Sequence, residues 1–494
     1  MLCVPTAPSL TALREFLIES GYTSTRLSKE LGLKRGLQTN LGNLEPLLER
    51  TSGDSTLPLL ARLFFIGWPV AIASCAKHIP ANVLQLCLES GLLAVDGENY
   101  APEFVIVPFE DTLFFSVDAG RLRGTREDIV IGPSGTTNII AKSLLRTPTK
   151  SVLDIGTGSG VLAVVASRFS EHVIGVDINE RAVECARFNA ALNGVANVEF
   201  VAGDAFAPAQ GRRFSRIIAN PPFFLAPRKR FTYSDSPLVL DGFTRKLAME
   251  APQYLEENGI FQMICEWVEV EGESADDRLR SWTQDSDCDV FVFFGPVATP
   301  IEYAENRFAE AGSLHTGENS MAERMNYFRE HKVKRILSGV INMRRRQGKN
   351  WFAVVPGSLS DQAANATAAR LYSLTLLSEY SDARWLETKL RLTPDTVITQ
   401  TQSLKEHGWA LTGATVSKPD GVNDPVQIDG PVLKAVELFD GTNTLTEIIH
   451  IVARLLGIPP QEAAERCLAL AKRLVQSSFI LPLEISPQQT EQVV

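Results

Sequence analysis

The stretch SVLDIGTGSG, residues 151–160, decides the fold class of this chain. It begins with β-forming residues that end at Asp154 and Ile155, continues with three glycines at alternate positions, and leads into a helical pattern at Val161. Glycines allow a tight turn and a close approach of the backbone to a ligand, and the first N–H groups of a following helix face that ligand. The stretch therefore predicts a strand, a turn at a site for a nucleotide-like ligand, and a helix.

The glycine spacing separates two kinds of nucleotide-like site. Dinucleotide-binding turns carry a third glycine where this chain has Val161, so that pattern is absent. A second strand-like run, His172–Asp177, ends in a carboxylate that can accept hydrogen bonds from both hydroxyls of a ribose. A third run leads into Gly203-Asp204-Ala205 and brings another carboxylate to a strand end. Strands that alternate with helical stretches in this way predict a mostly parallel sheet with helices on both faces.

A fourth motif, Asn220-Pro221-Pro222-Phe223, follows the strand-like run Phe214–Ala219. An amide or exocyclic amine nitrogen is a poor nucleophile because its lone pair is delocalised. Hydrogen bonds from its N–H groups to the Asn220 side-chain oxygen and the Pro221 carbonyl would favour a more nucleophilic nitrogen, and the two prolines would keep these acceptors in place. Phe223 offers a ring on which a planar acceptor can stack.

Together, the four motifs resemble those of class I S-adenosylmethionine (SAM) methyltransferases that act on planar nitrogens. The resemblance implies a Rossmann-like, doubly wound α/β fold, SAM as the cofactor and no metal in the reaction. It assigns catalysis to Asn220, Pro221, Pro222 and Phe223. It assigns cofactor binding to the residues of the glycine turn and of the strand ends, which are Asp154, Gly156, Thr157, Gly158, Gly160, Asp177, Ile178, Asp204, Ala205 and Asn220.

The sequence behind the fourth motif narrows the resemblance. It is similar to the release-factor glutamine methyltransferases of the HemK type, in which a Gly-Asp-Gly-Leu element, an arginine and a glycine turn precede a strand that ends in Glu. The corresponding residues here are Leu240-Asp241-Gly242, Arg245, Asn258-Gly259 and Glu266. The chain departs from that group in carrying Phe223 where Tyr is usual, in its larger flanks, and in an insertion over residues 296–334. Its whole layout is also similar to the long bacterial proteins of the "methyltransferase small domain" group.

The methyl acceptor has two candidate classes. The HemK resemblance favours a glutamine amide of a protein, and an exocyclic amine of an RNA base is the alternative. Arg228-Lys229-Arg230 directly follows the fourth motif, and further basic residues lie at 332–335 and in an expected hairpin at 344–349. They could form a phosphate-binding track, or they could be solvated loops that balance nearby acids. A third reading, a non-catalytic SAM-binding or nucleic-acid-binding adaptor, is disfavoured by the complete Asn-Pro-Pro-Phe motif.

Length and local patterns predict three modules. The chain has 494 residues, and at ~150 residues per domain it is too long for a single core. We place a helical, winged-helix-like accessory module at residues 1–126, the SAM-dependent catalytic domain at 127–357 and a second winged-helix-like module at 358–494. The first contains a hairpin signal at Asp96-Gly97, and the last contains three helical patterns and a closing strand.

Composition indicates an ordinary globular protein of the cytoplasm. The net charge is −10, from 48 basic and 58 acidic residues, which argues against coating of nucleic acid through bulk charge. The cysteines form no CxxC pair and the histidines show no ligand spacing, so we expect reduced thiols and no metal site. No signal peptide is evident, and no stretch reaches the ~20 apolar residues of a membrane span. We therefore expect a cytoplasmic enzyme whose partner is a macromolecular methyl acceptor and not a membrane.

Overall fold

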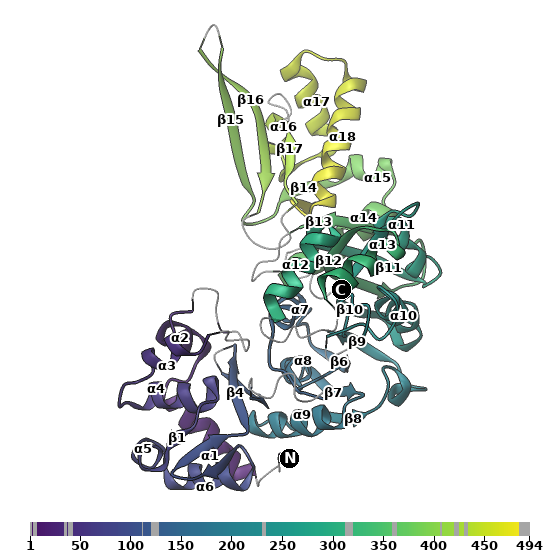
Figure 1. Cartoon of the computed structure of the whole chain (residues 1–494). Coiled ribbons are helices and arrows are strands. Elements are labelled where there is room, and N and C mark those ends of the chain that lie inside the picture. The colour runs from purple at the N-terminus through teal and green to yellow at the C-terminus, as the bar shows by residue number, and fades with distance from the viewer. Residues whose placement is uncertain are drawn as a thin grey trace. The chain divides into compact units, whose positions relative to one another are not determined.

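In the computed structural model the chain forms two compact units. Figure 1 labels the helices and strands. The structure describes residues 2, 7–33, 37, 43–110, 112–119, 128–229, 234–311, 320–357, 363–405, 408–418, 424–428 and 433–483. The first unit comprises residues 1–141, 148–283 and 297–338, and the second comprises residues 142–147, 284–296 and 339–494. The three-module division at 126/127 and 357/358 stays a prediction.

The sheet of the first unit has the strand order β12–β10–β9–β6–β7–β8. Its strands are β6 (Thr149–Ile155), β7 (Ser170–Asp177), β8 (Val198–Ala202), β9 (Phe214–Ala219), β10 (Leu255–Val270) and β12 (Val333–Arg345), whose residues from 339 onward belong to the second unit. β6 pairs in parallel with β7 and β9, β7 with β8, and β9 with β10. The chain crosses from β8 to the other side of β6, and ligands bind where strand order reverses in this way. The predicted doubly wound α/β class is confirmed.

Helices that bury apolar side chains cover this sheet. α8 (Val161–Ala166) and α9 (Glu180–Leu192) pack against β6, β7 and β8, whereas α10 (Gly242–Glu250) and α11 (Ala275–Thr283) pack against β10. The predicted insertion contains α12 (Pro300–Ala311) and α13 (Met321–Glu330), which pack on each other. The strand expected to end at Glu266 continues to Val270, because the strand remains fully buried at Trp267 and Val268.

The N-terminal elements belong to the same compact unit. The helical segments of this part of the chain are α1 (Ala7–Glu19), α2 (Ser24–Glu30), α3 (Glu45–Arg50), α4 (Thr56–Leu60), η1 (Ala61–Ile66), α5 (Ile72–His78), α6 (Ala81–Glu89) and α7 (Gly135–Ser143), whose last two residues belong to the second unit. Its strands are β1 (Val70–Ala71), β2 (Leu93–Asp96), β3 (Asn99–Pro102), β4 (Phe104–Phe109) and β5 (Leu113–Asp118). The expected hairpin forms between β2 and β3, and β4 pairs with β5. α1 and β5 both pack against α9, so one core joins these elements to the catalytic sheet.

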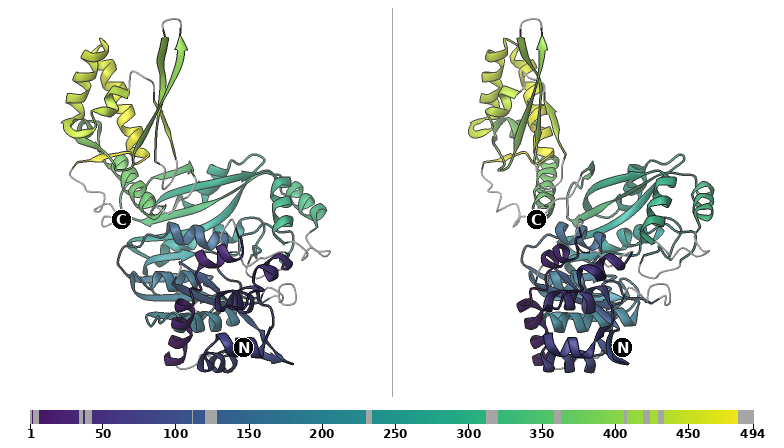
Figure 2. Two further views of the ribbon diagram at one scale, coloured as in Figure 1. Left: turned by 90° about the vertical axis from the view of Figure 1, so that its left-hand side faces the viewer. Right: turned by 60° about the vertical axis from the view of Figure 1, so that its left-hand side comes forward.

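The second unit also contains both helices and strands (Figure 2). Its elements are β11 (Cys288–Ala298), whose last two residues belong to the first unit, β13 (Phe352–Pro356), α14 (Ala363–Glu379), α15 (Asp382–Glu387), β14 (Lys389–Leu392), β15 (Val397–Lys405), β16 (Gly408–Ser417), β17 (Val426–Ile428), α16 (Leu433–Glu437), β18 (Asp440–Thr444), α17 (Leu445–Leu456), α18 (Pro460–Gln476) and β19 (Ile480–Pro482). Figure 2 shows the long β15–β16 hairpin beside α17 and α18. The winged-helix-like character of the flanks stays a prediction.

The expected hairpin at 344–349 is wrong, because β11 lies between β12 and β13 in the strand order. Arg344 and Arg346 at the end of β12 both pair with the fully buried carboxylate of Asp289, at 2.7 and 2.8 Å. A buried carboxylate needs such partners, so these two arginines stabilise the strand end and are not a phosphate track.

Two further findings concern the described residues only. None of their helices is long and apolar enough to cross a bilayer. Their six cysteines, Cys75, Cys87, Cys185, Cys265, Cys288 and Cys467, are all buried and free, as the sequence predicts.

Candidate active site

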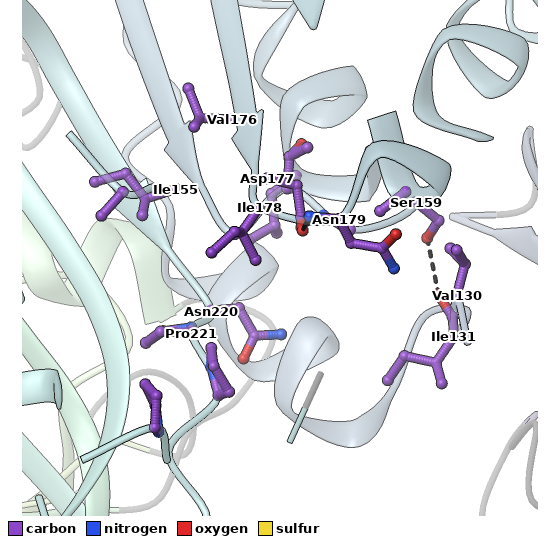
Figure 3. A pocket seen from close by; sticks show the side chains of 18 of the residues that line it. Val130, Ile131, Ile155, Ser159, Val176, Asp177, Ile178, Asn179, Asn220 and Pro221 are labelled. Atoms are coloured by element: carbon purple, nitrogen blue, oxygen red, sulfur yellow. Dashed lines mark hydrogen bonds between the residues drawn. The ribbon is translucent and has the colours of Figure 1, made fainter. Parts of the chain in front are cut away.

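A cavity of about 340 Å³ lies at the carboxyl ends of β6, β7, β8 and β9 (Figure 3). This volume is within the range of small-molecule sites. Ten of the predicted site residues line it, namely Gly156, Thr157, Gly158, Asp177, Ile178, Asp204, Ala205, Asn220, Pro221 and Pro222. The three remaining predicted residues, Asp154, Gly160 and Phe223, do not line it. The four sequence motifs are therefore brought together at one cavity.

The glycine turn after β6 is held against the end of β7. Gly156 and Gly158 have φ values of +69° and +54°, a left-handed backbone that favours glycine. The N–H groups of Gly156 and Thr157 both donate to the carbonyl of Val176 at 2.9 Å. The N–H of Gly158 donates to Asp177 Oδ2 at 2.8 Å. These hydrogen bonds hold the turn in place at the border of the cavity.

Asp154 supports the turn from the protein interior. Its side chain is fully buried, and Oδ2 accepts hydrogen bonds from Thr157 Oγ1 at 2.6 Å and from the N–H of Ala163 at 3.1 Å. Burial raises the pKa of this carboxyl to about 7, although the two hydrogen bonds oppose the shift. The contacts of Asp154 thus connect the turn to the first part of α8.

Gly160 is closely packed at the start of α8, and its predicted contact with the cofactor stays a prediction. It precedes α8 with a φ of +84°. A Cβ atom at this position would lie 3.0 Å from Ala186 Cβ and 3.2 Å from Phe200 Cζ. Only glycine therefore lets α8 approach these neighbours without a shift of the backbone.

Asp177 at the end of β7 has the geometry expected of a ribose ligand. Oδ1 accepts the N–H of Asn179 at 2.9 Å and Oδ2 accepts that of Gly158, so each oxygen keeps a second lone pair for a hydroxyl. Burial raises the pKa of this carboxyl. The next side chain, Ile178, is 63% exposed in the cavity and offers an apolar face to a flat base. Asp204, which follows the end of β8, lines the same cavity. Asp177, Ile178 and Asp204 together fit the adenosine part of SAM.

A wall of the cavity that the sequence motifs do not include is formed by Ile129, Val130 and Ile131. Figure 3 shows Ile131 on the opposite side of the open space from Asn220, with the carbonyl of Ile131 accepting a hydrogen bond from Ser159 Oγ at 3.1 Å. Asn179 also lines the cavity, and its Nδ2 donates to the Asp128 carbonyl at 2.9 Å. Apolar wall residues have no chemical signature in a sequence. Asn179 has one, because asparagine is a preferred N-cap, and it caps α9.

The opposite end of the cavity contains Asn220 with its two prolines. Asn220 Nδ2 donates to Thr137 Oγ1 at 3.3 Å, so the donor end of this amide is engaged and Oδ1 is the atom that can accept an N–H. Phe243 and Leu238 add apolar surface to the cavity lining, and Lys229 and Lys246 add two cations. None of these four residues belongs to the predicted site.

Phe223, the last residue of the fourth motif, is buried and does not line the cavity. Its ring is 5% exposed and contacts the ring of Phe224 edge to face, with centroids 5.2 Å apart. The stacking of an acceptor on Phe223 therefore stays a prediction.

Several basic residues of the expected phosphate-binding track have acidic partners. Lys332 lies 3.2 Å from Glu271, and Arg335 pairs with Glu269. Arg228 lies 3.8 Å from Glu323, and Arg230 falls outside the described residues. In the part of the chain that the structure describes, no group of three potential ligands that could hold a metal ion occurs.

The family described as Methyltransferase small domain matches residues 134–268, which include the four motifs. A relative from Methanocaldococcus jannaschii, named as a putative protein N5-glutamine methyltransferase, is 31% identical over 142 residues, which are 27% of this chain and 71% of the relative. The release factor glutamine methyltransferase of Geobacter sulfurreducens is 32% identical over 202 residues, 35% of this chain and 67% of the relative. The ribosomal RNA small subunit methyltransferase C of Alcanivorax borkumensis is 35% identical over 114 residues, 23% of this chain and 31% of the relative.

Proposed function

This chain belongs to the HemK-like group of class I SAM-dependent methyltransferases, and we propose that it transfers a methyl group to the side-chain amide nitrogen of a glutamine in a protein. The observation that carries this proposal is the position of Asn220 and Pro221 in the cavity that also contains Asp177 and the glycine turn. Two relatives named as glutamine methyltransferases of proteins support the choice of acceptor.

The residues of the nucleotide end would bind the cofactor without a metal. Asp177 would accept the ribose hydroxyls, Asp204 the adenine amino group, and the glycine turn would leave space for the methionine part. Bound SAM supplies a methyl group on a sulfonium, which is already activated for displacement. The chain therefore has to align the acceptor with that methyl group and exclude water.

The residues of the other end would activate the acceptor nitrogen. An amide NH₂ group has two N–H bonds, and Asn220 Oδ1 and the Pro221 carbonyl offer one acceptor for each. Two such bonds stabilise a pyramidal nitrogen, whose lone pair is no longer delocalised into the carbonyl group, and this is the form that attacks. Thr137 holds the Asn220 amide in the required orientation, and the proline rings restrict the backbone. Phe243 and Leu238 would pack on the aliphatic part of the glutamine.

Replacing Asn220 with Ala tests this role. We expect SAM affinity, measured by calorimetry, to stay within about threefold and methyl transfer at saturating SAM to fall about a hundredfold, the usual cost of losing one preorganised polar contact. Asn138→Ala is the matched control, because Asn138 follows Thr137, its side chain donates to the backbone carbonyl of Ser134, and it does not line the cavity. Full transfer by Asn220→Ala would refute the assignment.

A second acceptor class, an exocyclic amine of an RNA base, is favoured by the two cations in the cavity lining. Lys229 and Lys246 could contact a phosphate beside the base, and one relative is named for ribosomal RNA. Incubation with radiolabelled SAM and a cell extract, followed by separate RNase and protease digestion, distinguishes the classes. Label that survives RNase but not protease supports the glutamine, and the converse supports RNA.

We also propose the cytoplasm as the location. The six described cysteines are buried free thiols, which suits a reducing compartment. Selective release of the enzyme with the cytoplasmic fraction of its source cells would test this.

A further inference from the structure

The insertion that separates this chain from the HemK pattern packs directly behind the catalytic motif. α12 and α13 share a cluster of buried apolar side chains with the segment that follows Asn220-Pro221-Pro222-Phe223. The members of this cluster are Leu225, Leu240, Val268, Tyr303, Phe328 and Ile336. The insertion is therefore part of the core of the first unit at this point and not a solvated appendage.

Two side chains of the insertion hold the peptide groups of Leu225. The N–H of Leu225 donates to Tyr303 Oη at 3.0 Å, and the Leu225 carbonyl accepts from Arg324 at 3.0 Å. Leu225 and Tyr303 are almost fully buried, so water does not compete for these hydrogen bonds. Tyr303 Oη itself donates to Glu266 Oε2 at 2.6 Å. Burial raises the pKa of Tyr303 well above its usual range, so the hydroxyl keeps the proton that this bond needs.

The residue before Leu225 is fixed by both backbone and ring contacts. The N–H of Phe224 donates to the Ser234 carbonyl at 2.8 Å, and its carbonyl accepts from the N–H of Ser236 at 3.0 Å. The guanidinium of Arg307 lies 3.6 Å from the centre of the Phe224 ring and also donates to Glu266 Oε1 at 3.0 Å. One buried carboxylate thus orients both Tyr303 and Arg307.

The fixed pair Phe224–Leu225 is directly connected to the proposed catalytic residues. The motif is anchored at its start by Ala219, which is paired in β9 with strands on both sides. Its end is anchored by the two residues just described, and the Phe224 ring contacts that of Phe223. Four residues between two fixed points, two of them prolines, have little remaining freedom.

We propose that Tyr303, Arg307 and Arg324 of the insertion are positioning residues that hold the Asn-Pro-Pro-Phe loop in its reactive geometry. They do not line the cavity, and they act through Phe224 and Leu225. The inference deepens the proposed function and rests on it for the identity of the loop as catalytic. A loop displaced by about 1 Å can cost a hundredfold in rate even when the cofactor still binds.

The test uses the full chain and the variant Tyr303→Phe, which retains the ring and removes only the hydroxyl. We expect faster hydrogen exchange at the Leu225 amide, SAM affinity within about twofold of wild type, and methyl transfer into a cell extract reduced at least about tenfold at saturating SAM. The matched control is Tyr22→Phe, since Tyr22 is equally buried and loses a comparable hydrogen bond, 2.8 Å to the Ile106 carbonyl, away from the cavity. It should lose stability but not transfer activity.

A second pair of variants separates positioning from a general loss of folding. Arg324→Ala removes the donor to the Leu225 carbonyl, whereas Arg324→Lys retains a donor, so the lysine variant should recover part of the lost rate. Unchanged Leu225 exchange and unchanged transfer in Tyr303→Phe would overturn the proposal. The proposed function fails separately, if the wild-type chain labels no acceptor, and in that case the Leu225 exchange alone decides whether the insertion holds the loop.

Discussion

Arg181 forms a two-point ion pair with Asp118, in which two guanidinium nitrogens lie 2.7 and 3.0 Å from the two carboxylate oxygens. Asp118 is the last residue of β5. Arg181 lies in the first turn of α9, two positions after the cavity residue Asn179. The same carboxylate accepts the N–H of Val130 at 2.7 Å. The N-terminal hairpin therefore fixes one wall of the cofactor cavity.

Replacing Asp118 with Asn should weaken SAM binding. Asparagine has no negative charge to pair with Arg181 and only one side-chain oxygen to accept hydrogen bonds from Arg181 and from the N–H of Val130. The cavity wall formed by residues 129–131 therefore loses part of its support. We expect Kd, measured by calorimetry, to rise about tenfold, which corresponds to about 1.4 kcal/mol. Asp289→Asn is the control, because it neutralises an equally buried, arginine-paired carboxylate in the second unit, which contributes nothing to the cavity lining. Equal affinities in the two variants would contradict the role of Asp118.

The core of the site was predictable because its signals are local. A glycine turn, a carboxylate at a strand end and an Asn-Pro-Pro-Phe motif each occupy consecutive residues, and the parallel sheet then brings the strand ends together. Ten of the thirteen predicted residues line the cavity for this reason. The direction of a side chain is not a local signal, however. Asp154 and Phe223 belong to the motifs, but packing turns both into the interior.

Contacts between distant segments were not predictable. Nothing in the sequence around Ile129 or Ile131 indicates a cavity wall. The position of this segment depends on hydrogen bonds from Asn179, the N-cap of α9, and from Ser159 of the glycine turn. The insertion likewise has an evident helical pattern, but no periodicity reveals that Tyr303 contacts Leu225, 78 positions earlier. Such contacts depend on the packing of segments that lie far apart in the chain. The local pattern of a single sequence does not indicate which distant segments pack together.

Gly175 is a position at which a single methyl group should disturb both the core and the glycine turn. A Cβ atom there would lie 2.6 Å from Phe200 Cδ1 and 2.8 Å from Thr157 Oγ1. We expect Gly175→Ala to lower the free energy of unfolding by about 1–3 kcal/mol, the usual effect of overpacking, as measured in urea. Gly53→Ala is the control, since a Cβ at Gly53 meets no atom within 4 Å. If both variants unfold at the same urea concentration, the close packing around Gly175 is refuted.

The buried carboxyl of Asp154 makes stability depend on pH in a definite direction. Its pKa is about 7 in the folded chain, against an ordinary value of 3.8, and the shift is caused mainly by burial. Between these two values the folded chain retains a proton that the unfolded chain has lost. The stability that this group contributes is therefore present at low pH and is lost as the pH rises toward 7.

Asp154→Asn isolates this effect, because asparagine has the same shape and its oxygen can still accept from Thr157 and Ala163 but cannot ionise. The free energy of unfolding of the wild type, minus that of the variant, should fall by up to about 1.4 kcal/mol per pH unit from about pH 5 to about pH 7 and then become constant. Urea unfolding of both proteins across this range measures the difference, in which other titrating groups cancel. A difference that rises with pH would mean that Asp154 is ionised in the folded chain, and the support of the glycine turn would then come from a charged carboxylate.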